Sequence, residues 1–207
     1  MGRRRLTDER RTQILVGIFH AVVKKGYAGC TITDISEATN VSRGILHYYY
    51  KSKKEMLLSL MTSMGNTHYE GLGRLMGETE DVREKLKSIV RFHYMDESKF
   101  FHDTAGVWVE FWGQTPHDPE VREVVRTIQA RLRKRIAELV KEGMDQGVFR
   151  KVDPHNTASV IMSMMQGPTL QWNVDRKAVD IRALARTLEE FIDRYLENPS
   201  PRHGTEA

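Results

Sequence analysis

The strongest constraint on the fold is a helical spacing of apolar residues that recurs along almost the whole chain. Apolar side chains return every three or four positions, which places them on one face of an α-helix, while the alternation typical of strands is nearly absent. The longest run begins at Val121 and ends near Gly147. The pattern predicts an all-α protein of roughly nine helices.

Length and composition indicate a folded chain with room for one or two domains. The 207 residues are 40% hydrophobic and include 15 glycines, which is normal for soluble globular chains. No apolar stretch reaches the roughly 20 residues that span a bilayer, and the N-terminal sequence lacks the features of a secretory signal. Cys30 is the single cysteine, so an internal disulfide is excluded. We expect a cytoplasmic protein without membrane association, metal or cofactor.

Basic charge is concentrated at the N-terminal end of the chain. Residues 1–55 contain eleven Lys and Arg against five Asp and Glu, a net charge of +6, whereas the whole chain carries +4. The remaining residues are therefore faintly acidic. We call residues 1–55 the head and the remaining residues the body. A basic head on a faintly acidic body favours an anionic partner for the head. The alternative is that the basic residues form a solvated charged surface.

Two short helices around Asn40 have the dimensions of a helix-turn-helix. We expect the first at residues 31–39, with Thr31 as its N-cap, and the second at residues 42–48, with Ser42 as its N-cap. In this motif the second helix lies in the major groove of DNA. Five apolar residues are expected to hold the two helices in place: Ile35, Ala38, Val41, Ile45 and Leu46.

The outward positions of the second helix carry groups that bind DNA. Arg43 can donate two hydrogen bonds to a guanine, His47 and Tyr48 can reach bases or phosphates, and Gly44 permits close approach of the backbone. Lys53, which begins the next helix, joins its charge to free backbone N–H groups and is expected to hold a phosphate. The predicted DNA-binding residues are Thr31, Thr33, Ser42, Arg43, Gly44, His47, Tyr48, Tyr49 and Lys53.

The stretch from Asp34 to Lys53, with VSRGILHYYYKSK at its centre and Glu55-Met56-Leu57 after it, resembles the TetR-type transcriptional regulators. The family pattern has an aromatic pair, then His-Phe, then Lys-x-Lys. In this chain Tyr49 stands in place of the usual histidine and His47 in place of the first aromatic residue. The resemblance implies a homodimeric repressor that binds a palindromic double-stranded DNA operator and is released by a small-molecule effector.

Two other classes of function are weighed against this one. An effector-independent DNA-binding or architectural protein would share the head but need no effector site. An enzyme is not expected, because the chain contains no P-loop, no G-x-S-x-G elbow and no glycine-rich loop after a strand. No catalytic residue is therefore assigned.

The resemblance also implies how the chain is divided. Residues 1–54 would form a three-helix DNA-binding domain, and residues 55–198 a six-helix domain for effector binding and dimerisation. Residues 199–207 contain proline and glycine and are expected to be a disordered tail.

The last two helices, expected at about residues 154–172 and 177–197, each carry a wide apolar face. Such faces fit a four-helix bundle formed by two subunits, and an ordinary intramolecular core is the alternative. The predicted dimerisation residues are Ile161, Met165, Leu184, Leu188, Phe191 and Ile192.

Trp108 and Trp112 stand about one helical turn apart and fit the wall of an effector pocket, although plain core packing would explain them as well. The segment GVWVEFWGQTPHDPEV looks like the body of BetI-type regulators, which respond to choline. An aromatic cage suits a quaternary ammonium. Glu110 is expected to project away from both tryptophans. The predicted ligand-binding residues are His93, Trp108, Phe111, Trp112, Met165 and Gln166.

Three further expectations concern the head. The first helix is expected to run from about Asp8 to Gly26. Cys30 and Tyr50 are expected to be buried packing residues. The arginines at positions 3 to 5 form either a solvated tail or a flexible arm along the adjoining minor groove.

Overall fold

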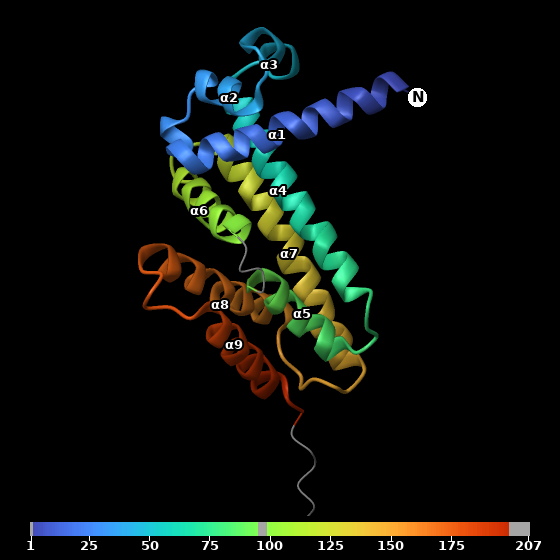
Figure 1. The fold of residues 1–207 in the computed structure, drawn as a ribbon. Coiled ribbons are helices and arrows are strands. Elements are labelled where there is room, and N and C mark those ends of the chain that lie inside the picture. The colour runs from blue at the N-terminus through green and yellow to red at the C-terminus, as the bar shows by residue number, and fades with distance from the viewer. Residues whose placement is uncertain (1, 95–98, 199–207) are drawn as a thin grey trace, which may run out of the picture. The chain divides into compact units, whose positions relative to one another are not determined.

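The computed structural model describes the backbone of residues 2–94 and 99–198, and the side chains of residues 9–94 and 103–198. This described part contains nine helices and no strand, with one isolated β-bridge between Phe149 and Glu197, so the all-α prediction is confirmed. The helices are α1 (Gly2–Gly29), α2 (Ile32–Thr39), α3 (Arg43–Tyr49), α4 (Lys53–Met76), α5 (Val82–Tyr94), α6 (Lys99–Gln114), α7 (Pro119–Asp145), α8 (Pro154–Val174) and α9 (Ile181–Leu196) (Figure 1).

The chain forms two compact units, and each is described by itself. Unit 1 consists of Met1–His68 and Ser98–Ile128, and unit 2 of Tyr69–Glu97 and Gln129–Ala207. Helices α4 and α7 contribute to both units, so neither unit is one continuous segment. The predicted domain boundary after residue 54 stays a prediction, and the expected tail at residues 199–207 lies outside the described residues.

Apolar side chains of α1 belong to the hydrophobic core of unit 1. Ile14, Ile18 and Val22 are fully buried and recur at helical spacing, as the sequence pattern predicts. Cys30 and Tyr50 are also buried, which confirms their predicted packing role. Because burial disfavours a charged sulfur, it raises the pKa of the Cys30 thiol.

Two of the five apolar residues expected to hold the helix-turn-helix are exposed. Ile35, Val41 and Leu46 are buried, but the prediction was wrong for Ala38 and for Ile45, which is 40% exposed. For Ile45 the reason is geometric: α3 has only seven residues, so a single face of it meets the core. Leu46 occupies that face.

Helix α1 is longer than the apolar pattern predicts. It begins at Gly2 rather than near Asp8, and its helical geometry breaks at Gly26, where φ is 75° and ψ is 167°. The prediction that the first helix is interrupted at Gly26 is therefore confirmed. One further helical turn follows the break and ends at Gly29. The backbone at residues 3–5 is helical, and the choice between a solvated tail and a minor-groove arm for these arginines stays open.

Unit 2 is built from α5, α8 and α9 together with the ends of α4 and α7. Tyr94 of α5, Met165 of α8 and Leu188 of α9 are among its buried side chains. Ion pairs join α5 to α9: Arg83 contacts Asp193 at 3.2 Å, and Arg91 contacts Glu189 at 3.1 Å.

Among the described residues, no helix is long and apolar enough to cross a membrane. The same residues contain no group of three or more His, Cys, Asp or Glu arranged to hold a metal ion.

Candidate nucleic-acid interface

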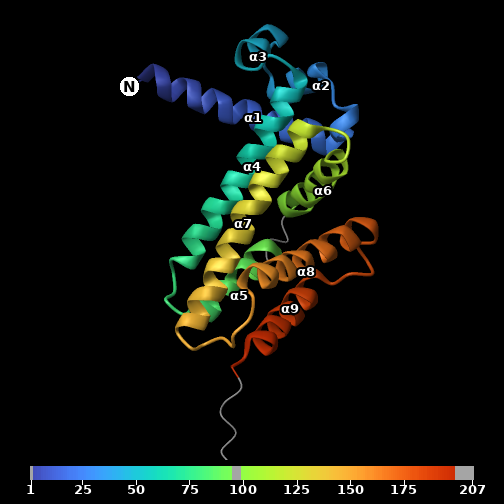
Figure 2. The same ribbon diagram turned by 180° about the vertical axis from the view of Figure 1, so that it is seen from behind.

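The turn between α2 and α3 is held in one conformation by backbone and side-chain hydrogen bonds. Asn40 adopts the left-handed conformation with φ of 52°, which asparagine tolerates better than most residues. The N–H of Val41 then donates to the Ser36 carbonyl at 3.2 Å, and the Ser36 hydroxyl donates to the Val41 carbonyl at 2.7 Å. With Val41 buried, this arrangement sets the angle between the two helices (Figures 1 and 2).

Both helices begin with the predicted N-caps. Thr31 and Asp34 form a capping box: the Asp34 N–H donates to Thr31 Oγ1 at 3.2 Å, and the Thr31 N–H donates to Asp34 Oδ2 at 2.8 Å. The hydrogen bonds from Thr31 lower the pKa of the Asp34 carboxyl. Ser42 caps α3 by accepting from the Ile45 N–H at 3.4 Å. These two hydroxyls therefore stabilise the first turns of α2 and α3.

The predicted DNA-binding positions of α3 share an exposed face. Ser42, Arg43, Gly44, His47 and Tyr48 are all exposed, and Tyr48 is 83% exposed. A Cβ added at Gly44 would meet no atom within 4 Å, so another surface can approach the backbone there. Tyr49 differs from them: it is half-buried and packs against the core of unit 1.

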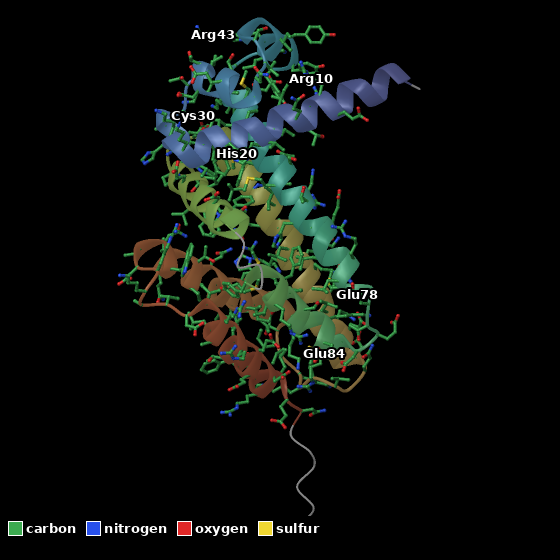
Figure 3. All side chains as sticks on the ribbon, in the orientation of Figure 1. Arg10, His20, Cys30, Arg43, Glu78 and Glu84 are labelled. Atoms are coloured by element: carbon green, nitrogen blue, oxygen red, sulfur yellow. The ribbon has the colours of Figure 1, made fainter. Side chains whose placement is uncertain are left out.

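Arg43 is oriented by a residue of the preceding helix. Its guanidinium donates from Nη2 to Thr33 Oγ1 at 2.6 Å, which brings two of the predicted DNA-binding residues together. Figure 3 shows Arg43 at the tip of unit 1. Because a guanidinium has five N–H groups, this bond positions the side chain and leaves donors for a base.

Lys53 opens α4 and is half-buried. Its Nζ donates to the Ala28 carbonyl at 3.1 Å, which uses one of three ammonium donors. The adjacent Lys54 faces another way: its Nζ lies 3.0 Å from Asp118 and 2.6 Å from Glu120. Hydrogen bonds to these two carboxylates raise the pKa of Lys54. Of the two lysines, Lys53 keeps the role of candidate phosphate ligand.

The predicted ligand-binding residues of unit 1 lie on α6. Phe111 is fully buried in the core, with its ring edge-on to Tyr27 at 5.7 Å between centroids. Trp108 and Trp112 are half-buried and pack against the same core. Glu110 accepts a hydrogen bond from the backbone N–H of Tyr27, and its expected projection away from the tryptophans stays a prediction.

Two polar atoms on the tryptophan face of α6 are buried without a hydrogen-bond partner. They are Thr104 Oγ1 and Trp112 Nε1. Thr104, Trp108 and Trp112 are spaced by four residues, which puts them on one face of the helix. Sequence reasoning missed Thr104, although this spacing would have pointed to it.

The predicted ligand-binding residues of unit 2 are all engaged within that unit. His93 Nε2 lies 3.3 Å from the Thr169 hydroxyl, and Gln166 donates to Gln129 at 2.8 Å. Met165 is buried, and its carbonyl accepts a hydrogen bond from the Tyr94 hydroxyl.

The predicted dimerisation residues differ in their burial within a single chain. Ile161, Met165, Leu188 and Ile192 are buried inside unit 2 of a single chain, Leu184 is half-buried, and Phe191 is 58% exposed. Other large apolar side chains of the same two helices are exposed, and sequence reasoning did not separate them from the buried ones. We call these residues the exposed apolar stripe: Val160, Leu170 and Val174 of α8 with Phe191 and Tyr195 of α9.

Together, the capped helix pair, its tight turn and the exposed face of α3 define a helix-turn-helix DNA-binding protein. A family model described as bacterial regulatory proteins, tetR family, matches residues 14–60, and one described as BetI-type transcriptional repressor, C-terminal, matches residues 82–197. The chain therefore belongs to the TetR family of transcriptional regulators, with a C-terminal region of the BetI type.

Relatives of known name and structure agree with this assignment. The HTH-type transcriptional regulator BetI of Paraburkholderia phytofirmans is 22% identical over 192 residues, covering 92% of this chain and 95% of the relative. A transcriptional regulator from Saccharomonospora viridis in complex with choline has a TM-score of 0.84 at 23% identity, covering 92% of this chain and 99% of that one. FadR of Bacillus subtilis in complex with stearoyl-CoA has a TM-score of 0.78 at 19% identity, covering 90% and 99%.

Proposed function

We propose that this TetR-family regulator is a homodimeric repressor that binds a palindromic operator and leaves it when a small molecule binds the C-terminal region. The observation that carries the proposal is the exposed face of α3, on which Arg43 is positioned by Thr33. In a dimer, two such faces would enter successive major grooves, about 34–36 Å apart on one side of the DNA.

The exposed apolar stripe of α8 and α9 supports the dimer. Large apolar side chains left uncovered on adjacent helices mark an association surface. A two-fold axis would pair the stripe with its copy as a four-helix bundle. The half-buried Leu184 lies seven residues before Phe191, on the same face of α9, whereas the buried residues of α9 hold the helix to its own chain.

For the effector, a quaternary ammonium compound such as choline is the first candidate. The BetI-type match and the choline complex of the S. viridis regulator support it, as does the pair Trp108 and Trp112, because indole faces attract cations. The unpartnered Trp112 Nε1 fits an effector that also carries a hydrogen-bond acceptor, such as a hydroxyl oxygen.

Operator binding is tested by comparing two substitutions on DNA selected from a random pool by the wild-type protein. Arg43→Ala is expected to cost about 1–3 kcal/mol at one base pair of each half-site and to relax the preference there. Lys53→Ala is expected to weaken all sequences alike and to reduce the slope of log K against log salt by about 0.9 per half-site. Both are measured by fluorescence anisotropy. An unchanged base preference in Arg43→Ala would show that Arg43 reads no base.

Effector binding is tested by thermal melting with choline, with stearoyl-CoA as the comparison ligand. At about 100 times its Kd, a ligand adds about 2.7 kcal/mol to the free energy of unfolding. Trp112→Phe keeps an aromatic ring but removes the indole N–H, so it is expected to reduce the choline-induced rise in Tm. Trp172→Phe, in unit 2, is the matched control and should keep the rise. If no compound in a wider metabolite panel raises the Tm, the effector-independent alternative is favoured.

A further inference from the structure

The connection between α7 and α8, residues 146–153, is anchored within unit 2. Phe149 is 2% exposed, and its N–H donates to the Gly143 carbonyl at 2.9 Å. A Cβ at Gly143 would lie 2.0 Å from Phe149 Cδ2, so the ring packs directly against the backbone of α7. The Arg83 guanidinium of α5 lies over the same ring, 5.5 Å from its centroid. The next residue, Arg150, therefore starts from a fixed backbone position.

Arg150 makes three contacts with the end of α9. Its backbone N–H donates to the Leu196 carbonyl at 3.0 Å, its Nε donates to the Tyr195 carbonyl, and its guanidinium carbon lies 4.3 Å from the centroid of the Tyr195 ring. The Asn198 side-chain amide also donates to the Gly147 carbonyl at 3.1 Å. The last turn of α9 is therefore held to the α7–α8 connection, which lies beside it in Figures 1 and 2.

The ring that Arg150 holds belongs to the exposed apolar stripe. Tyr195 is 49% exposed, whereas its neighbour Leu196 is fully buried. A tyrosine that moves freely loses side-chain freedom when it enters an interface, and this loss weakens association. Because the Arg150 guanidinium stacks on a ring that is still half exposed, Tyr195 is ordered in the single chain and keeps surface for a partner.

We propose that Arg150 is a positioning residue of the dimer, which holds Tyr195 in the orientation in which its ring packs against a second copy of this chain. A second copy is the expected partner because Tyr195 continues the stripe: Phe191 precedes it by about one turn on the same face of α9. The inference rests on the proposed dimer through α8 and α9, and it extends the association surface to the α7–α8 connection.

The dissociation constant of the dimer, measured by sedimentation equilibrium on the full chain, tests this role. Arg150→Ala is expected to raise it by about tenfold or more, because two tyrosines, one from each copy, must then be ordered on association. Arg131→Ala is the matched control. Its guanidinium lies 4.2 Å from the Tyr69 ring centroid, on α7 and α4 rather than α8 and α9, so this variant should dimerise like wild type. An unchanged dissociation constant in Arg150→Ala would overturn the proposal.

A double-mutant cycle shows whether Arg150 acts through Tyr195. Tyr195→Leu keeps an apolar side chain but removes the ring on which the guanidinium stacks. In that background Arg150→Ala should change the dissociation constant by less than about twofold. An equal loss of dimer affinity in the two backgrounds would mean that Arg150 acts elsewhere, which contradicts the proposal.

A monomeric background separates positioning from plain stabilisation of the fold. Leu170→Glu puts a charge into the exposed apolar stripe on α8 and should give a folded monomer. There Arg150→Ala should shift the urea midpoint only slightly, because the main-chain bond to Leu196 is kept. A loss of monomer stability equal in free energy to the loss of dimerisation would make the role of Arg150 structural and overturn the proposal. A Leu170→Glu protein that stays dimeric would instead contradict the proposed dimer surface, and this inference with it.

Discussion

Phe191→Arg is expected to convert the proposed dimer into folded monomers. Phe191 is 58% exposed on α9, within the exposed apolar stripe, so the arginine is tolerated in a single chain. In the symmetric bundle the substitution occurs twice, at about 2 kcal/mol or more for each lost central aromatic residue. The dimer should therefore weaken by about 4 kcal/mol, or about a thousandfold, and operator affinity should fall with it.

Sedimentation velocity and circular dichroism distinguish this outcome from unfolding. Phe191→Leu keeps an apolar side chain and should remain dimeric. Leu188→Arg serves as the opposite control: Leu188 is buried in its own chain, and a charge there has no partner to offset its desolvation, so the protein should unfold. A folded Phe191→Arg dimer would place the interface elsewhere.

Gly17→Ala is expected to destabilise unit 1, although alanine is the better helix former. A Cβ at Gly17 would lie 2.2 Å from Thr39 Cγ2 and 2.9 Å from Thr39 Cα. Thr39 cannot simply turn away, because its hydroxyl donates to the Ile35 carbonyl at 2.8 Å. We expect a loss of about 2 kcal/mol in the free energy of unfolding, measured by urea denaturation.

Two further variants isolate the cause. Gly73→Ala, in α4, adds a Cβ that meets no atom within 4 Å and should stabilise the protein by up to about 1 kcal/mol through helix propensity. Thr39→Ser removes the clashing methyl group, so the pair Gly17→Ala/Thr39→Ser should recover part of the loss in a double-mutant cycle. A fully stable Gly17→Ala would show that α1 and α2 are not closely packed there.

The helix-turn-helix was predictable because its signals are local. Thr31 and Ser42 cap the helices that follow them, and each short helix buries an apolar residue of its own, Ile35 in α2 and Leu46 in α3, so neighbours in sequence determine the motif. The bond between Arg43 and Thr33 was not predictable, because it joins two helices whose relative angle is set by the turn between them. Ile45 was misplaced for a similar reason: spacing alone does not say which side of a short helix meets the core.

The longer helices α9 and α1 were also predicted only in part. The apolar face of α9 is visible in the sequence, but the pattern does not separate the part that packs on its own chain, such as Leu188, from the part left uncovered, such as Phe191. The start of α1 was missed because residues 2–13 are helical without apolar periodicity. Arginine and glutamate favour helix by intrinsic propensity. Intrinsic propensity is a weaker indicator of a helix than the periodic apolar residues of a buried face.

Because unit 1 is made of two separate stretches of chain, DNA specificity and effector specificity cannot be exchanged cleanly by a single crossover. A chimeric regulator joined soon after α3 would keep Tyr27 and Lys54 of this protein but take α6 and the start of α7 from another. In this protein the Tyr27 amide donates to Glu110, and Lys54 pairs with Asp118 and Glu120. In the chimera, residues of the other regulator would stand in place of these three carboxylates. Transplanting unit 1 intact requires two inserts, Met1–His68 and Ser98–Ile128, and the second of them carries Trp108 and Trp112 with it.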